Sequence, residues 1–187
     1  MRMTTLTSLL LTVPLLACTS QDLEPRAAAS RAAAQEFMQD LKATLQQAMK
    51  EGGPVNAIAV CNEKAPAIAT EMSAGKGWRI ARTSLKVRNP ANAPDNWERA
   101  VLEDFEKRKA QGDKPEAMEH YEIVQQNGKQ MFRYMKAIPT AEICTACHGE
   151  QIGDEIAAKL KELYPADQAT GFKPGDIRGA FTITQPL

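Results

Sequence analysis

Hydrophobic residues recur every three or four positions in the first part of the chain, which is the spacing of an α-helix. The pattern predicts an amphipathic helix from about Ala28 to Glu51, and Gly52-Gly53 is a typical helix end. Pro54 suits the first turn of a second helix. The apolar face of that helix includes Cys61, and we expect Pro66 to bend or break it.

After Gly77, strand-like segments alternate with two further helices. Apolar residues at helical spacing predict helices from Trp97 towards Gly112 and from Ile156 to Leu163. Asn127-Gly128 is a strong hairpin signal. β-Branched and aromatic residues predict strands at Trp78–Leu85, Tyr121–Gln125, Lys129–Ile138 and Ile177–Thr184. Together these elements predict an α+β fold, an antiparallel sheet with flanking helices.

The N-terminus resembles an export signal. Arg2 precedes an apolar run that ends at Leu16 and is too short to span a bilayer permanently. Ala17-Cys18 closes a stretch that resembles the bacterial lipobox, where the cysteine is lipidated and becomes the new N-terminus. The alternative is an ordinary secretory signal with a chance cysteine. We expect a signal peptide over residues 1–17, a lipidated N-terminus and spacer over 18–27, and one domain over 28–187.

This interpretation predicts a protein of the bacterial cell envelope that faces the periplasm. No other segment has 18 consecutive apolar residues, so the lipid would be its tether to the membrane. Thr19 does not resemble an inner-membrane retention signal, which favours the outer membrane.

Composition narrows the class of protein further. The 187 residues include 23 Lys plus Arg against 23 Asp plus Glu, and 43% are hydrophobic. This length suits one domain. Balanced charge without a basic block argues against nucleic-acid binding, and the ordinary apolar fraction argues against disorder. The chain is therefore expected to be globular.

The most specific chemical motif is Cys144-Thr145-Ala146-Cys147-His148, the C-x-x-C-H attachment motif of c-type haem. Cys144 and Cys147 would add to the two haem vinyl groups, and His148, the next residue, would reach the iron as the proximal ligand. We therefore expect one covalent haem c.

Other uses of these cysteines fit less well. A C-x-x-C pair can form half of a zinc site, but tetrahedral zinc needs four ligands and no second pair follows. A thioredoxin-like pair would begin a helix after a strand and would not require His148. Once Cys18, Cys144 and Cys147 have these separate roles, Cys61 has no partner, and no disulfide is expected.

The second axial position of the iron has several candidates, which are Cys61, His120 and the eight methionines. Methionine would favour a high-potential electron carrier, whereas a thiolate would lower the potential. Regularly spaced methionines usually fill the core, and His120 stands beside Glu119, as surface histidines often do. The chemistry of the residue alone supports two roles for Cys61 equally, either as an iron ligand or as a small apolar side chain of the core.

Five stretches of the chain resemble the Tll0287-like haem-domain family, and the resemblance covers the whole mature sequence. They are Ala59–Ala69, Arg82–Glu98, Phe132–Lys136, Cys144–Gly149 and Gly175–Gly179. The resemblance implies a PAS-like fold that holds one covalent haem c, with His148 and Cys61 as axial ligands. Ala137 departs from the family, which more often has proline there, and this difference concerns the end of a strand.

The two haem propionates need cationic or amide partners where they are partly buried. Candidates in the matched stretches are Arg82, Lys86, Arg88 and Arg178, and the alternative for each is ordinary surface charge. Asn89, Asn92 and Asp95 are expected to shape a loop over the haem edge.

Two functions suit these features. A thiolate ligand and the PAS-like resemblance favour a haem-based sensor of redox state or of a small gas ligand, which would signal through a separate redox or signalling protein. A methionine ligand would favour a simple electron carrier. We do not expect an enzyme, because a peroxidase needs a distal acid–base pair and only His120 is left to supply one.

Overall fold

The computed structural model describes residues 23–187, so the predicted signal peptide and Cys18 lie outside the described residues. Within this range no helix combines the length and the apolar character needed to cross a membrane. In chain order the elements are α1 (Glu24–Lys76), β1 (Arg79–Thr83), α2 (Asn96–Ala110), β2 (Glu119–Gln126), β3 (Lys129–Pro139), α3 (Thr145–His148), α4 (Asp154–Leu163) and β4 (Ile177–Pro186).

The four strands form one antiparallel sheet in the order β1-β4-β3-β2. The predicted hairpin at Asn127-Gly128 joins β2 to β3. β4, the last strand in sequence, pairs with β3 on one side and β1 on the other, which explains why most of its residues are buried. The predicted α+β fold with an antiparallel sheet is confirmed, and its classification as PAS-like stays a prediction.

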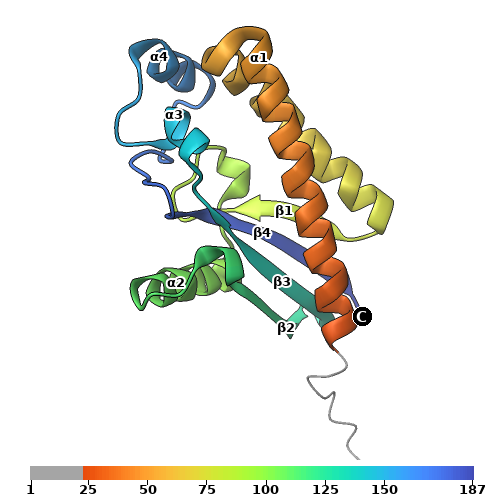
Figure 1. The fold of residues 1–187 in the computed structure, drawn as a ribbon. Helices are drawn as coiled ribbons and strands as arrows, with labels where there is room; N and C mark the ends of the chain where they lie inside the picture. The colour runs from red at the N-terminus through yellow and green to blue at the C-terminus, as the bar shows by residue number, and fades with distance from the viewer. Residues whose placement is uncertain (1–22) are drawn as a thin grey trace, which may run out of the picture.

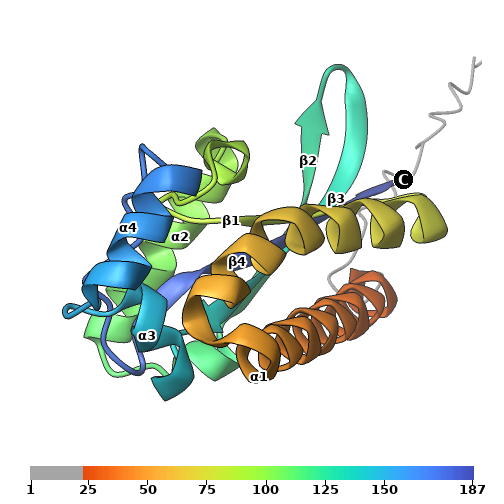
Figure 2. The ribbon, with the colours of Figure 1, turned by 90° about the horizontal axis from the view of Figure 1, so that it is seen from above.

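α1 consists of two helical arms that fold back beside each other (Figures 1 and 2). The break lies at Gly52 and Gly53, as predicted. Gly53 has a φ of 68°, a backbone conformation that residues other than glycine rarely adopt. Across the bend, Asn56 Nδ2 donates to Ala48 O at 3.0 Å. This bond satisfies one of the carbonyls that a helix leaves free at its C-terminal end.

The bounds of α1 differ from the prediction at two places. α1 begins at Glu24, inside the predicted spacer, because Ala27 is fully buried in the core. Pro66 does not break the second arm, which continues to Lys76. A proline removes one backbone hydrogen bond from a helix, but Met72 anchors the arm beyond it in the core. Burial therefore outweighs the local cost of the proline.

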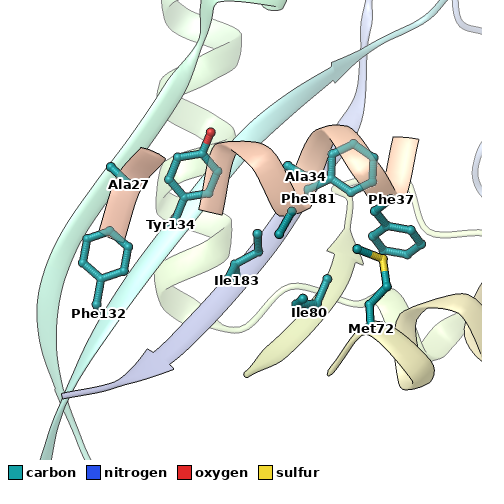
Figure 3. Close-up of a cluster of buried hydrophobic side chains, with 10 residues drawn as sticks. Ala27, Ala34, Phe37, Met72, Ile80, Phe132, Tyr134, Phe181 and Ile183 are labelled. Carbon is teal, nitrogen blue, oxygen red and sulfur yellow. The ribbon is translucent and has the colours of Figure 1, made fainter. Parts of the chain in front are cut away.

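The sheet carries a helix on each face. Phe132 and Tyr134 of β3 pack with α1, whereas Met135 and Ala137 of the same strand pack with α2. This alternation is the two-residue period of a strand. Figure 3 shows the α1 side, where Phe37 meets Phe181 with ring centroids 5.2 Å apart. Both faces are thus filled by core side chains.

The short helix α3 and its neighbour α4 lie at one end of the sheet, beside the bend of α1 (Figure 1). The start of α1 and the C-terminus lie at the opposite end. The C-x-x-C-H motif is therefore far from the end where the described chain begins.

Candidate haem site

A cleft lies between the two arms of α1, the end of the sheet and α3. Cys144, Cys147 and His148 line it, and so does Cys61 from the second arm of α1. The three cysteines are free thiols. Much of the remaining wall is apolar, contributed by Leu41, Leu45, Ala57, Ile58, Ile138 and Ile143. Folding thus brings Cys61 to the C-x-x-C-H motif although the two are far apart in sequence.

Local hydrogen bonds shape the C-x-x-C-H segment into a single helical turn. Thr145 Oγ1 donates to Glu142 O at 2.7 Å, and Gly149 N donates to Thr145 O at 2.8 Å, where the turn ends. A Cβ on Gly149 would lie 2.5 Å from Thr145 O, so the turn needs a glycine there. The turn places Cys144 and Cys147 on the same side of the helix, three positions apart.

The His148 ring is neutral, and its Nε2 lies 3.4 Å from Arg88 Nη1. Its Nδ1 lies 2.7 Å from Ala169 O. A carbonyl only accepts, so Nδ1 carries the proton and Nε2 keeps its lone pair. Burial, with Arg178 and Arg88 nearby, holds the pKa of His148 well below its usual value. This tautomer is the form in which a histidine binds a metal through Nε2.

Arg178 lies against the same ring. Its Nε is 3.2 Å from His148 Nδ1, but a nitrogen that already carries a proton cannot accept another. Arg178 instead donates through Nη1 to Ser84 Oγ at 3.1 Å and to Lys86 O at 3.3 Å. Burial, followed by repulsion from Arg88 and Arg82, lowers the pKa of Arg178 to about 10.

The cleft holds more positive than negative charge. Arg82, Arg88 and Arg178 line it, and Arg88 forms an ion pair with Asp167 at 3.0 Å. Within residues 23–187, no carboxylate forms an ion pair with Arg82 or Arg178. Burial lowers the pKa of Arg82, against the opposing influence of Cys61 and Tyr164. Two partly buried cations are thus left for an anionic group.

Lys86, the fourth predicted propionate partner, does not line the cleft. Its Nζ lies 5.0 Å from the ring centre of Phe172 and donates to Thr170 O at 3.2 Å. Asn89 and Asn92 do line the cleft, whereas Asp95 does not. The expectation that Asp95 shapes the loop over the site is wrong, because this residue caps the start of α2.

Two lining residues, Met49 and Tyr164, were not singled out by the sequence. Met49 follows Leu45 at helical spacing, and this signal places both on one face of the first arm. Tyr164 follows α4, where no local pattern points to a site. Burial raises the pKa of Tyr164 and also that of the nearby Cys61 thiol, while Arg82 and then Arg88 oppose the rise at Cys61.

His120 lies outside the cleft, on the edge strand β2. Its Nε2 is 3.1 Å from Glu122 Oε1, its side chain is 41% exposed, and its ring centre lies 5.9 Å from that of Trp97. The cleft walls, as far as the structure describes them, contain His148 and no second histidine. His120 therefore has the surroundings of a surface histidine.

The model of the Tll0287-like family matches residues 20–186. The chain belongs to the Tll0287-like family. It is similar to a solved structure described as the cyanobacterial heme-protein Tll0287, with a TM-score of 0.63 and 24% identity over 91% of this chain and 98% of that chain. At this identity the likeness shows a shared fold. A search of curated proteins found no match.

The donor set of this Tll0287-like protein fits a c-type haem. Two thiols three positions apart, a neutral imidazole and a facing thiol stand beside apolar walls and two cations without carboxylate partners. An apolar ring with two carboxylates matches that combination. A zinc ion fits less well, because no three His, Cys, Asp or Glu side chains in the described part of the chain are grouped to hold a metal ion.

Proposed function

We propose that this member of the Tll0287-like family is an exported, lipid-anchored monohaem c-type cytochrome that senses redox state or a small ligand. The observation that carries the proposal is the cleft in which the C-x-x-C-H side chains, Cys61 and two arginines without carboxylate partners meet. The solved relative is described as a heme-protein, which supports the same class of cofactor for this chain.

Each side chain of the cleft has a proposed role. Cys144 and Cys147 would hold the haem through thioether bonds, and His148 Nε2 and Cys61 would bind its iron. Arg82 and Arg178 would pair with the propionates. When bound, the haem would supply a one-electron Fe(III)/Fe(II) couple, and a thiolate ligand would favour the ferric form. Arg88 is already committed to Asp167 and is a weaker propionate candidate.

The position of Cys61 favours sensing. It lies on the second arm of α1, beyond the bend at Gly52 and Gly53. A thiol can be oxidised, protonated or replaced by a small ligand such as a gas. Each of these changes would alter what holds the second arm at the cleft. The signal would then pass to a separate redox or signalling protein.

The second candidate function is simple electron transfer, and Met49 is the observation that favours it. This thioether lines the same cleft, and methionine ligation would raise the potential. An enzymatic role has less support. A peroxidase needs a distal acid–base pair, and His120 lies outside the cleft, so we propose a non-enzymatic protein.

The first experiment tests covalent attachment. Purified protein produced with the haem-attachment machinery should retain haem after denaturing electrophoresis, and the Cys144→Ser/Cys147→Ser double variant should not. Haem that leaves the wild-type protein under denaturing conditions would contradict c-type attachment.

The second experiment assigns the axial ligand with a matched pair of variants. Ferric and ferrous optical and EPR spectra are recorded for wild type, Cys61→Ser and Met49→Leu, with His120→Gln as a control remote from the cleft. Thiolate ligation predicts that only Cys61→Ser changes the ferric spectra. A change confined to Met49→Leu would favour the electron carrier.

The anchor and the cleft are proposed to lie at opposite ends of the protein. Cys18 precedes Glu24, the first residue of α1, by six positions in the sequence, whereas α3 lies at the opposite end of the sheet from the start of α1 (Figure 1). The cleft would then face the periplasm, away from the membrane and accessible to a partner protein. A Cys18→Ser variant should be released into the soluble periplasmic fraction, and density-gradient fractionation of wild type should recover it with the outer membrane.

A further inference from the structure

The segment after α4 is fastened along the C-x-x-C-H motif. Phe172 N donates to His148 O and Gly171 N donates to Gly149 O, each at 2.9 Å. In the same segment, Ala169 O accepts a hydrogen bond from His148 Nδ1 at 2.7 Å. The orientation of the predicted iron ligand therefore depends on where this segment holds the Ala169 carbonyl.

Asp167 fixes that carbonyl from within the segment. Its Oδ1 accepts a hydrogen bond from Ala169 N at 2.8 Å, and its Oδ2 accepts one from Arg88 Nε at 3.0 Å. The side chains of Asp167 and Arg88 are only 10% and 11% exposed. An ion pair this well shielded from water has a defined geometry and interacts more strongly than a surface pair.

Arg88 extends this contact to the motif itself. Its Nη2 donates to Cys147 O at 2.6 Å and to Ala169 O at 3.2 Å. One guanidinium thus joins three segments of the chain, which are the loop after β1, the C-x-x-C-H turn and the segment after α4. Arg88 thus has a carboxylate partner as well as backbone partners, whereas within residues 23–187 Arg82 and Arg178 form no ion pair with a carboxylate.

We propose that Asp167, through Arg88, is a positioning residue that holds Ala169 O on His148 Nδ1 and thereby sets the donor strength of His148 Nε2 toward iron. The inference rests on the proposed function. A hydrogen bond from the second ring nitrogen fixes the tautomer and raises the basicity of a histidine ligand. A more basic ligand favours ferric iron, so the contact keeps the reduction potential low.

Asp95 provides a matched control at the other end of the molecule. Its Oδ1 accepts from Glu98 N at 2.8 Å and its Oδ2 pairs with Arg133 at 2.8 Å. Asp95 therefore makes the same two kinds of contact as Asp167, but it does not line the cleft. Comparing the two single variants separates an effect that acts through His148 from the effect of removing any aspartate with these two kinds of contact.

The experiment measures haem-loaded wild type, Asp167→Ala and Asp95→Ala. In Asp167→Ala the ferric-to-ferrous ratio at a fixed ambient potential should fall by about tenfold, which is 59 mV for a one-electron couple. NMR of the ferrous protein should show faster solvent exchange of the His148 Nδ1 proton. Asp95→Ala should change neither. An unchanged potential or an unchanged exchange rate in Asp167→Ala would overturn the inference.

A second variant separates positioning from charge. Arg88→Gln/Asp167→Asn keeps the net charge of wild type but removes the ion pair. The potential should rise in this variant too, and a wild-type potential would show that Asp167 acts by charge alone. If wild type carries no haem, the proposed function fails. Backbone amide exchange of Ala169, Gly171 and Phe172 still tests the contact then, and unchanged protection in Asp167→Ala would refute it.

Discussion

Arginines at two ends of the sheet have opposite surroundings. Near α2, Arg79 and Arg133 converge on Glu98, whose carboxylate is 1% exposed, with Nη to Oε1 distances of 3.2 and 3.1 Å. In the cleft, Arg82 and Arg178 are partly buried, and within the described residues 23–187 neither forms an ion pair with a carboxylate. Arg79 and Arg82 stand three positions apart on β1, which directs them to opposite faces of the sheet.

The difference separates charges that hold the fold together from charges kept for a ligand. Around Glu98 every buried charge is compensated, and Thr182 Oγ1 adds a hydrogen bond to Glu98 Oε1 at 2.8 Å. The uncompensated cations of the cleft cost the haem-free protein stability, because burying a charge without a partner is unfavourable. The proposed propionates would remove that cost.

The largest effect is expected from breaking the compensated cluster. Glu98→Ala removes the buried partner of Arg133, which keeps only the half-exposed Asp95. The change should lower the free energy of unfolding by about 3–5 kcal/mol, as measured by urea denaturation. Glu103→Ala, at an exposed position on the same helix, should change it by less than about 0.5 kcal/mol. A similar loss of unfolding free energy in both variants would show that the buried ion pairs of Glu98 contribute no more to stability than an exposed glutamate does.

A smaller loss is expected in the cleft, where backbone contact decides the geometry. Gly149→Ala introduces a Cβ 2.5 Å from Thr145 O, and overpacking of this kind costs about 1–3 kcal/mol. Its melting temperature and haem content should both fall. Gly153→Ala is the control, because a Cβ there meets no atom within 4 Å. Equal behaviour of the two variants would contradict the steric argument.

Removing an uncompensated cation from the cleft should raise the free energy of unfolding, whereas the two preceding variants lower it. Arg178→Met keeps an apolar chain against Phe172 and removes the buried charge, so the free energy of unfolding of the haem-free protein should rise by about 1–2 kcal/mol. Arg79→Met, which leaves Glu98 with one fewer cation, should lower it. Chemical denaturation of both haem-free variants measures whether the free energy of unfolding rises or falls relative to wild type. A lower free energy of unfolding in Arg178→Met than in wild type would show that the charge of Arg178 does not destabilise the haem-free protein, and would contradict the comparison with Arg79.

The smallest effect is a pH dependence of the compensated region. Burial alone would raise the pKa of Asp95, but the hydrogen bond from Glu98 N and the Arg133 guanidinium outweigh it and lower the pKa. A lowered carboxyl pKa gives stability that is present above the unfolded pKa of about 3.9 and is lost as the pH falls through the folded value. Because the side chain is 45% exposed, the contribution should stay below about 1 kcal/mol.

Urea denaturation at pH 6, 4 and 3 tests this dependence. The difference in unfolding free energy between wild type and Asp95→Asn should shrink as the pH falls below about 4. A difference that is the same at all three pH values would show that Asp95 contributes no pH-dependent stability.

Much of the fold could be predicted because its signals are local. The glycine pair in α1, the Asn127-Gly128 hairpin and the helical spacing in α2 and α4 each act over a few neighbouring residues. The sequence predicts a bend or break at Pro66 because the local effect of a proline in a helix is unfavourable, while the distant contact of Met72 that offsets it has no local signal. Tyr164 could not be predicted for the same reason, because it reaches the cleft through the packing of α4 and has no local sequence signal.

Local sequence is enough to identify the chemical groups: the C-x-x-C-H spacing, a further cysteine, and the arginines in the matched stretches. Which of these groups meet depends on how distant segments pack. Within residues 23–187, packing brings Cys61 to the motif, leaves Arg82 and Arg178 without a carboxylate partner, pairs Arg88 with Asp167 and leaves Lys86 outside the cleft. Spacing along a helix turn depends on neighbouring residues, whereas compensation of a buried charge depends on side chains that approach from distant parts of the chain.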